Sequence, residues 1–355
     1  MKQFIGCDSH RRYSVFVAMD EAGKASRPVR VEHEANELVG FLSSLPAEAS
    51  VAVEATGSWY WIVDAMEAAG LETHLAQPFA AKRMLGGGKK TDAVDAKALA
   101  TLLRNGTLPE VWIPDAQLRD LRNLVRCRLA LRQYQTGFKC RVVAAVNRYG
   151  LREADEDADL FHGKGRVRLS VYIGRLPPHT REAATREWQI IDEMEQHIED
   201  LQQEIRKRIG SLGWTRRLKT MPGVGEVLGA TIFMEIGAVK RFPSAQHLAS
   251  YAGLVPVVHA SGGKTFHGPT SPRSNRFLRW AFVEAANSIV RYQKKYPERH
   301  TVKLYQRLKA AKGHNKAVVA VARHLAESAW WILTKAQDYR PPQPAAGAVA
   351  SSNNG

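Results

Sequence analysis

Four acidic residues stand where a folded chain could bring carboxylates together. Asp8 ends the apolar segment IGCD, Glu54 ends VAVE, and Asp92 and Asp95 open KTDAVDAKALA. Because Asp92 and Asp95 are three residues apart, they share one face of a helix. Each acid alone has an ordinary explanation as a turn residue or as a favourable charge at a helix start. Together they predict an oxygen-rich site for Mg²⁺ or Mn²⁺, since clustered carboxylates repel one another without a cation.

The elements that must position these acids are short strands and helices in the first hundred residues. In an α/β sheet, functional groups converge at strand ends and helix starts, which is where all four acids are expected. Hydrophobic patterning predicts strands at 4–7, 14–18, 29–31, 51–54 and 72–76, and helices at 36–43, at 59–69 and from Thr91 onward. We therefore expect an N-terminal α/β domain.

Composition points to a polyanionic partner. The chain has 355 residues, a formal net charge of +16 and 45% hydrophobic residues. This balance predicts a globular, multidomain protein that binds nucleic acid. A membrane is disfavoured, because no long apolar run occurs and the basic residues are spread along the chain. The early polar N-terminus and three cysteines without a CxxC pattern predict a cytosolic, nucleoid-associated protein without disulfides or structural zinc.

Two long helices are expected in the middle of the chain. Residues 116–149 form one, 151–180 are expected to be loop-like, and 181–209 form the second, with apolar residues at coiled-coil spacing. The pair is either a simple antiparallel hairpin or a hairpin that also binds RNA and a second subunit. The first helix is rich in arginine, which favours a nearby anion. Its candidate phosphate ligands are Arg119, Arg122, Arg126 and Arg132.

The pattern of residues 218–237 predicts a helix, a PGVG turn and another helix. This is either a plain helix pair in a core or a helix-hairpin-helix element, whose Gly223 and Gly225 would let backbone N–H groups meet phosphate. The Pro/Ala/Ser/Asn-rich tail, 341–355, is expected to be disordered.

A glycine-rich loop after Tyr251 carries Ser261 in ASGGK and runs into a helix. Ser261 is either an ordinary turn serine or a nucleophile, which needs charge neutralisation at the phosphate and room for DNA. His259 and His267 are possible local bases. The candidate nucleic-acid-binding side chains near this loop, and before the Asp92 helix, are Lys264, Arg273, Arg276, Arg279, Lys89 and Lys90.

The motifs IGCDSH, VEATGSWY, KKTDAVDAKALA, MPGVG and LASYAGLVPVVHASGGK together resemble the DEDD transposases of insertion sequences, the IS110 family and its IS1111 relatives. The resemblance covers nearly the whole chain. It implies a RuvC-like, RNase H-like domain at 1–150, a linker and coiled-coil helix at 151–210, and a mainly helical transposase domain at 211–340.

The resemblance also implies roles for particular residues and partners. Asp8, Glu54, Asp92 and Asp95 would hold Mg²⁺ or Mn²⁺, and Ser261 would attack DNA and hold it as a phosphoserine intermediate. The partners implied are donor and target DNA, a structured bridge RNA that guides both, and further copies of the chain, as a dimer that assembles to a tetramer. Two departures stand near the serine: Ser274 where family members usually have glycine, and Pro272 where a basic residue is common.

Two other functions are compatible with parts of the sequence. A RuvC-like junction resolvase or nuclease would use the four acids and metal-activated water, and would need neither the serine nor the C-terminal domain. A non-catalytic nucleic-acid-binding protein would be expected to lose one or more of the acids, and all four are present.

Overall fold

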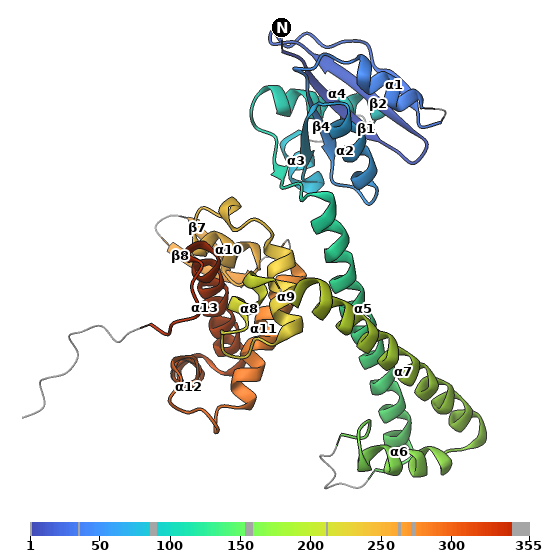
Figure 1. Cartoon of the computed structure of the whole chain (residues 1–355), viewed down its shortest axis with the longest axis vertical. Coiled ribbons are helices and arrows are strands. Elements are labelled where there is room, and N and C mark those ends of the chain that lie inside the picture. The colour runs from blue at the N-terminus through green and yellow to red at the C-terminus, as the bar shows by residue number, and fades with distance from the viewer. Residues whose placement is uncertain are drawn as a thin grey trace, which may run out of the picture. The chain divides into compact units, whose positions relative to one another are not determined.

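The structure is a computed structural model that describes residues 2–34, 36–85, 91–152, 159–210, 212–261, 264–270 and 274–342 (Figure 1). The chain divides into two compact units, Met1–Pro114 and Asp115–Gly355. The long helix after Pro114 therefore packs with the second unit. The boundary at residue 150 that the sequence suggests is a different division of the chain, and it stays a prediction.

The first unit is built on a six-stranded mixed sheet in the order β3-β2-β1-β4-β5-β6. Strands β1, β4 and β5 are parallel, whereas β2, β3 and β6 run antiparallel to their neighbours. The strands are β1 (Phe4–Ser9), β2 (Tyr13–Met19), β3 (Val29–Glu32), β4 (Ser50–Glu54), β5 (Glu72–Ala76) and β6 (Glu110–Val111).

Helices cover both faces of this sheet. On one face, Ile5, Cys7 and Val53 pack in a core with residues of α1 (Glu37–Ser44) and α2 (Trp59–Ala68). On the other face, Ala52 packs with Leu99 of α4 (Asp92–Arg104). Because side chains alternate along a strand, residues 6 and 8 of β1 face α4, while residues 5 and 7 face the opposite core.

The predicted strands and helices of the first unit are confirmed, with ends shifted by up to two residues. The sequence missed α3 (Pro78–Leu85) and the two-residue strand β6. Helix α3 has only eight residues and β6 only two, so neither is long enough to show a clear period in the sequence.

The second unit is mainly helical, with one β-hairpin. Its helices are α5 (Ala116–Arg148), α6 (Lys164–Gly174), α7 (Pro178–Ile205), α8 (Gly213–Leu218), α9 (Glu226–Ile236), α10 (Ala245–Tyr251), α11 (Arg276–Arg291), α12 (His300–Lys312) and α13 (His314–Lys335), and β7 (Pro256–Ser261) pairs with β8 (Lys264–Thr270). One large core joins α9, α10, α11, α12 and α13.

Helices α5 and α7 run antiparallel along each other (Figure 1). Arg128 of α5 donates to Gln202 of α7 at 2.8 Å, and Gln135, further along α5, donates to the carbonyl of Ile191, earlier in α7. This antiparallel pairing is the geometry expected of the predicted hairpin.

The expectation of a loop over residues 151–180 is wrong. Within the described residues, α6 occupies Lys164–Gly174 and α7 begins at Pro178. The glycines and prolines that suggested a loop are helix-start residues. Gly163 precedes α6 with φ +50°, a conformation that glycine adopts without strain, and Pro178 stands in the first turn of α7, where its missing N–H costs nothing.

Candidate functional site

Helix α4 lies directly against β1 because residue 6 is glycine. A Cβ on Gly6 would stand 1.8 Å from the carbonyl oxygen of Ala96, which no side chain could tolerate. Gly6 pairs with Ala52 on the neighbouring strand β4, so two of the smallest residues lie side by side where α4 crosses the sheet. One helical turn before Ala96, α4 begins at Asp92. The close packing therefore carries the start of α4 to the carboxyl ends of β1 and β4.

Asp8 and Asp92 meet at this edge around one imidazole. Nε2 of His10 lies 3.3 Å from Oδ2 of Asp8 and 3.2 Å from Oδ2 of Asp92. One ligand atom from each of these three residues lies within 4.8 Å of the others. Tyr13 of β2 donates a hydrogen bond of 3.0 Å to the same oxygen of Asp92. The edge thus gathers side chains from β1, the turn after it, β2 and α4.

Glu54 and Asp95 belong to the same neighbourhood. Cys7 pairs with Val53, so Asp8 and Glu54 stand side by side one residue further along two parallel strands, both on the face that α4 covers. Asp95 is close enough to influence the ionisation of Asp8. All four predicted acids therefore lie at one edge of the sheet, where an oxygen of Asp8 and an oxygen of Asp92 are within 4.8 Å of each other.

Neither aspartate of α4 is needed as a helix cap. The side chain of Thr91 accepts the hydrogen bond from the N–H of Val94 and so caps the helix itself. The simpler explanation of Asp92 and Asp95, that they only cap α4, is thereby weakened, although both remain in the favourable first turn.

The surroundings of Asp8 disfavour a negative charge on its carboxyl group. Burial raises the pKa of Asp8; His10 lowers it, and the Asp92 and Asp95 carboxylates raise it further. Among the described residues, no lysine or arginine forms an ion pair with Asp8 or Asp92. A donor set of carboxylate oxygens and one imidazole suits a divalent cation, so the residues present fit the metal that a DEDD site implies.

His10 and Tyr13 are site residues that the sequence did not single out. Both stand in the segment SHRRY, between the strands predicted at 4–7 and 14–18. A signal was available for His10, because a residue two positions beyond a strand-end aspartate points to the same side of an extended chain.

Ser261 closes the first strand of the hairpin in the second unit. It pairs with Lys264, so the two described residues nearest the turn face each other across β7 and β8. His259 pairs with Phe266, and His267 with Val258. Arg276 and Arg279 open α11, which follows the hairpin. Lys89, Lys90, Pro272 and Arg273 lie outside the described residues, as does most of the predicted disordered tail.

Two family models match the chain, one from its N-terminus to the end of α5 and the other from α8 onward. A DEDD transposase model of the IS110 type matches residues 5–150, which include all four acids, and the model described as the transposase IS116/IS110/IS902 family matches residues 215–301, which include Ser261. The chain belongs to the IS110/IS1111 family of transposases. It is therefore a transposase of an insertion sequence, an enzyme that cleaves and joins DNA, and its sheet is the RNase H-like DEDD domain that the motifs implied.

Two relatives match nearly the whole length of the transposase, and a third matches part of it. The transposase for insertion sequence element IS1111A of Coxiella burnetii is 25% identical over 95% of this chain and 91% of its own length. A putative transposase, y4pF/y4sB, of Sinorhizobium fredii is 25% identical over 95% of this chain and 85% of its own. The insertion element IS110 protein of Streptomyces coelicolor is 34% identical over 38% of this chain.

The arginines of α5 have partners inside the transposase. Arg122 is buried and donates to the carbonyls of Met234 and Glu235, at 2.6 and 3.1 Å. Arg126 donates two hydrogen bonds, of 2.7 and 2.8 Å, to the buried Glu235 carboxylate. Arg132 pairs with Glu195 of α7 at 3.1 Å. Arg119 is also buried. This geometry argues against the phosphate-binding role predicted for these four arginines.

The turn between α8 and α9 packs tightly against α11 on one side and borders a cavity on another. Gly223 has φ +76°, and a Cβ there would lie 2.2 Å from the carbonyl oxygen of Ala285. A cavity of about 590 Å³ borders the turn, and Lys219, Arg299 and Thr301 line it beside Gly223 and Gly225. Thr301 is buried and its hydroxyl lacks a hydrogen-bond partner among the described residues. The turn therefore faces a basic recess.

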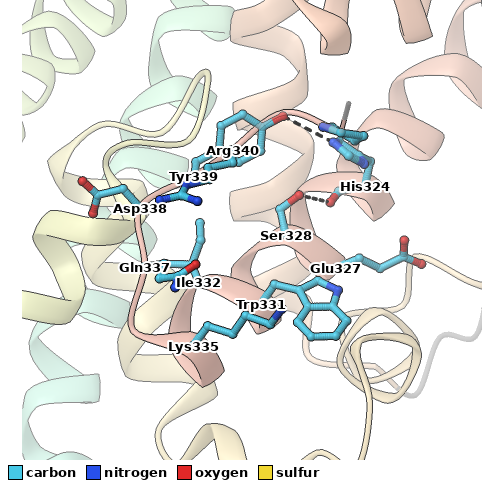
Figure 2. A pocket seen from close by; sticks show the side chains of 11 residues that line it. His324, Glu327, Ser328, Trp331, Ile332, Lys335, Gln337, Asp338, Tyr339 and Arg340 are labelled. Atoms are coloured by element: carbon cyan, nitrogen blue, oxygen red, sulfur yellow. Dashed lines mark hydrogen bonds between the residues drawn. The ribbon is translucent and has the colours of Figure 1, made fainter. Parts of the chain in front are cut away.

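A second cavity in this unit, of about 450 Å³, lies between α13 and the segment after it (Figure 2). In Figure 2, His324 points to the hydroxyl of Tyr339, 3.4 Å away, and Lys335 lies by the ring of Trp331. The lining carries Glu327 and Asp338 as well as Lys335 and Arg340. Because it mixes both charge signs, this cavity offers no uniform attraction to a polyanion.

No helix among the described residues is long and apolar enough to cross a membrane.

Proposed function

We propose that this transposase cuts and rejoins DNA through a covalent bond between Ser261 and a DNA phosphate, with a divalent metal held by Asp8, Glu54, Asp92 and Asp95. The observation that carries the metal site is the meeting of Asp8 and Asp92 at the sheet edge, with Glu54 on the adjacent strand and Asp95 on the same helix face. We assign Mg²⁺ or Mn²⁺ to the site on the oxygen-rich donor set.

The chemistry divides between the two units. When bound, the metal supplies charge neutralisation at the phosphate and lowers the pKa of a nearby hydroxyl. Ser261 supplies the nucleophile: its Oγ forms a bond to phosphorus as the bond from phosphorus to a deoxyribose oxygen breaks, and that oxygen leaves with a proton. Attack by a second DNA end reverses the step and releases the serine. Lys264, Arg273, Arg276 and Arg279 would attract the phosphate backbone.

The two catalytic parts belong to separate compact units, so we propose that assembly brings them to one phosphate. The partners are donor and target DNA, a structured bridge RNA that chooses both sequences, and further copies of the chain, as a dimer that assembles to a tetramer. What supports RNA guidance is the family, together with the net charge of +16. The protein would act in the cytosol, at the nucleoid.

The turn at Gly223 and Gly225 is the contact that we propose for the DNA backbone. Helices α8 and α9 flank it as a helix-hairpin-helix element would require. The recess in front of it carries Lys219 and Arg299, and the N–H groups of a glycine turn can approach phosphate closely. Such a contact reads shape and charge, and it leaves sequence choice to the RNA.

The decisive experiment traps the covalent adduct. Wild-type protein, loaded with its copurifying RNA and Mg²⁺, is mixed with a nicked suicide DNA substrate, and the residue attached to DNA is mapped by mass spectrometry. We expect the adduct on Ser261, and expect Ser261→Ala to bind DNA without forming it. The paired variants His259→Ala and His267→Ala test for a local base. If one of these histidines were the base, its loss would suppress the adduct as strongly as replacing one of the four acids by alanine.

Three outcomes would contradict the proposal. An adduct that persists in Ser261→Ala means that another residue attacks. Cleavage by the wild type without any adduct means that water attacks, as in a junction resolvase. DNA binding with neither cleavage nor adduct, under conditions in which a second family member reacts, means a protein that only binds nucleic acid.

A further inference from the structure

His10 lies between two carboxylates of the site, those of Asp8 and Asp92. Its Nε2 is 3.3 Å from Asp8 and 3.2 Å from Asp92, almost equally far from both. This nitrogen is shielded from solvent, and it makes no well-aligned hydrogen bond to either oxygen. The imidazole is therefore held between the two carboxylates, at ion-pair distance from both.

Three potential donor atoms lie close enough together to share one cation. The nearest oxygens of Asp8 and Asp92 and the nitrogen of His10 lie within 4.8 Å of one another. A cation bound by both aspartates would have this imidazole as its next neighbour. Neutral imidazole is a common metal ligand, and a buried ring nitrogen without a well-aligned hydrogen bond is costly unless something binds it.

Tyr13 orients both the imidazole and one carboxylate. Its ring packs on that of His10 with centroids 4.7 Å apart, and its hydroxyl donates to Oδ2 of Asp92 at 3.0 Å. The Arg30 guanidinium lies 3.5 Å from the centre of the Tyr13 ring and so holds the ring in place. The three donor atoms are thus preorganised by residues of β2 and β3, which is how metal ligands are usually supported.

We propose that His10 is a metal ligand of this site, which makes the subsite of Asp8 and Asp92 a mixed nitrogen and oxygen site. A nitrogen ligand favours transition-metal ions such as Mn²⁺ relative to Mg²⁺, which takes oxygen ligands and keeps its waters. His10 would therefore decide which metal the transposase prefers. This inference rests on the proposed metal function of the acids.

The test measures metal binding directly, on the full-length, tag-free protein. Mn²⁺ is titrated and followed by electron paramagnetic resonance, and pulsed measurements detect the modulation that a coordinated ¹⁴N nucleus imposes on the Mn²⁺ signal. Mg²⁺ affinity is obtained by competition. The variants are His10→Gln, which keeps an N–H donor but removes the imidazole, and Asp92→Ala, with melting curves to confirm that each is folded.

The matched control is His74→Gln. His74 also lies between two carboxylates, 3.5 Å from Glu72 and 3.1 Å from Glu110. It stands on β5 two residues before Ala76, the partner of Glu54, and so lies away from the carboxyl end of the strand. A histidine that is merely near acids should behave like His74.

We expect ¹⁴N modulation in the wild type and in His74→Gln, and its loss in His10→Gln. The Mn²⁺ dissociation constant of His10→Gln should rise by about tenfold or more, with a smaller change for Mg²⁺. Two outcomes would overturn the role of His10 but leave the metal site in place. One is modulation that persists in His10→Gln. The other is a wild-type Mn²⁺ signal without modulation, together with an affinity that still depends on Asp92. Unchanged Mn²⁺ binding by Asp92→Ala overturns the metal site itself.

Discussion

The carboxylate edge of the first unit and the arginine-rich helix of the second unit both concentrate one sign of charge, but the fold treats them differently. On α5, Arg122 and Arg126 are matched by the carbonyls and the carboxylate of Glu235, and Arg132 by Glu195. At the sheet edge, Asp8 and Asp92 meet each other across His10.

The difference separates structural charge from functional charge. A buried charge with a good internal partner is stabilising only as a pair, and its role is complete within the protein. Like charges that the fold brings together without a strong counter-charge cost stability, so their proximity points to a ligand from outside. In the sequence, both regions looked like ligand sites because each gathers charges of one sign.

The largest effect that tests this comparison is expected at Arg126. Arg126→Ala leaves the buried Glu235 carboxylate without its guanidinium, and should lower the free energy of unfolding by about 3–5 kcal/mol. Urea denaturation measures the change. The exposed pair of Arg186 and Glu182 is the control, since Arg186→Ala should cost less than about 0.5 kcal/mol. Equal losses in the two variants would mean that α5 is not held by its buried pair.

At the carboxylate edge, loss of a charge should impair activity without lowering stability. Asp92→Ala should lower the rate of DNA cleavage by at least about a hundredfold, which corresponds to about 2.7 kcal/mol, because a metal ligand is lost. The metal-free variant should melt no lower than the wild type, since a repulsive charge is removed. A variant that cleaves normally would remove Asp92 from the metal site.

The same variant carries a pH signature. The raised pKa of Asp8 means that the folded protein holds its proton more tightly than the unfolded chain, so metal-free stability falls as pH rises from 3.8 toward the raised value. Without Asp92 this fall should be shallower. Melting curves of the two proteins in chelator, compared over that range, measure the difference.

Gly6 tests whether close packing of α4 positions the acids. Gly6→Ala places a methyl group against the Ala96 carbonyl and should cost about 1–3 kcal/mol and weaken metal binding, because α4 must move away from β1. Gly40→Ala is the control: Gly40 lies within α1 with open space around it, so alanine there should be neutral or stabilising. Metal affinity unaffected by Gly6→Ala would show that the acids do not depend on this contact.

The smallest expected effect concerns the cap of α4. Thr91→Ala removes the hydrogen bond to the N–H of Val94 and should cost about 1 kcal/mol, whereas Thr91→Ser should retain most of it. Denaturation midpoints of the two variants measure the difference. If Thr91→Ala were silent, one of the aspartates would be serving as the cap, and the simple explanation of Asp92 and Asp95 would regain weight.

Local patterns were sufficient for much of the fold. Alternating apolar residues predicted β1, β2, β4 and β5, and the apolar spacing of residues 181–209 predicted the long helix α7, because burial of one face imposes a period that is visible in one dimension. The acids were found for a similar reason, since strand ends and helix starts can be located along the chain. The segment 151–180 failed because glycine and proline punctuate helix starts as well as loops.

The sequence by itself determined most of the elements, the position of the four acids near their ends or starts, and the family to which the motifs belong. Only the tertiary structure decided which charged side chains pair with one another inside the fold and which lack a strong counter-charge there. Arg126 and Glu235 are 109 residues apart, and Tyr13 and Asp92 are 79 apart, so neither pairing leaves a local trace. Partners of a charge are chosen by packing of distant elements, as when Gly6 admits α4, and a periodic pattern records only which face is buried.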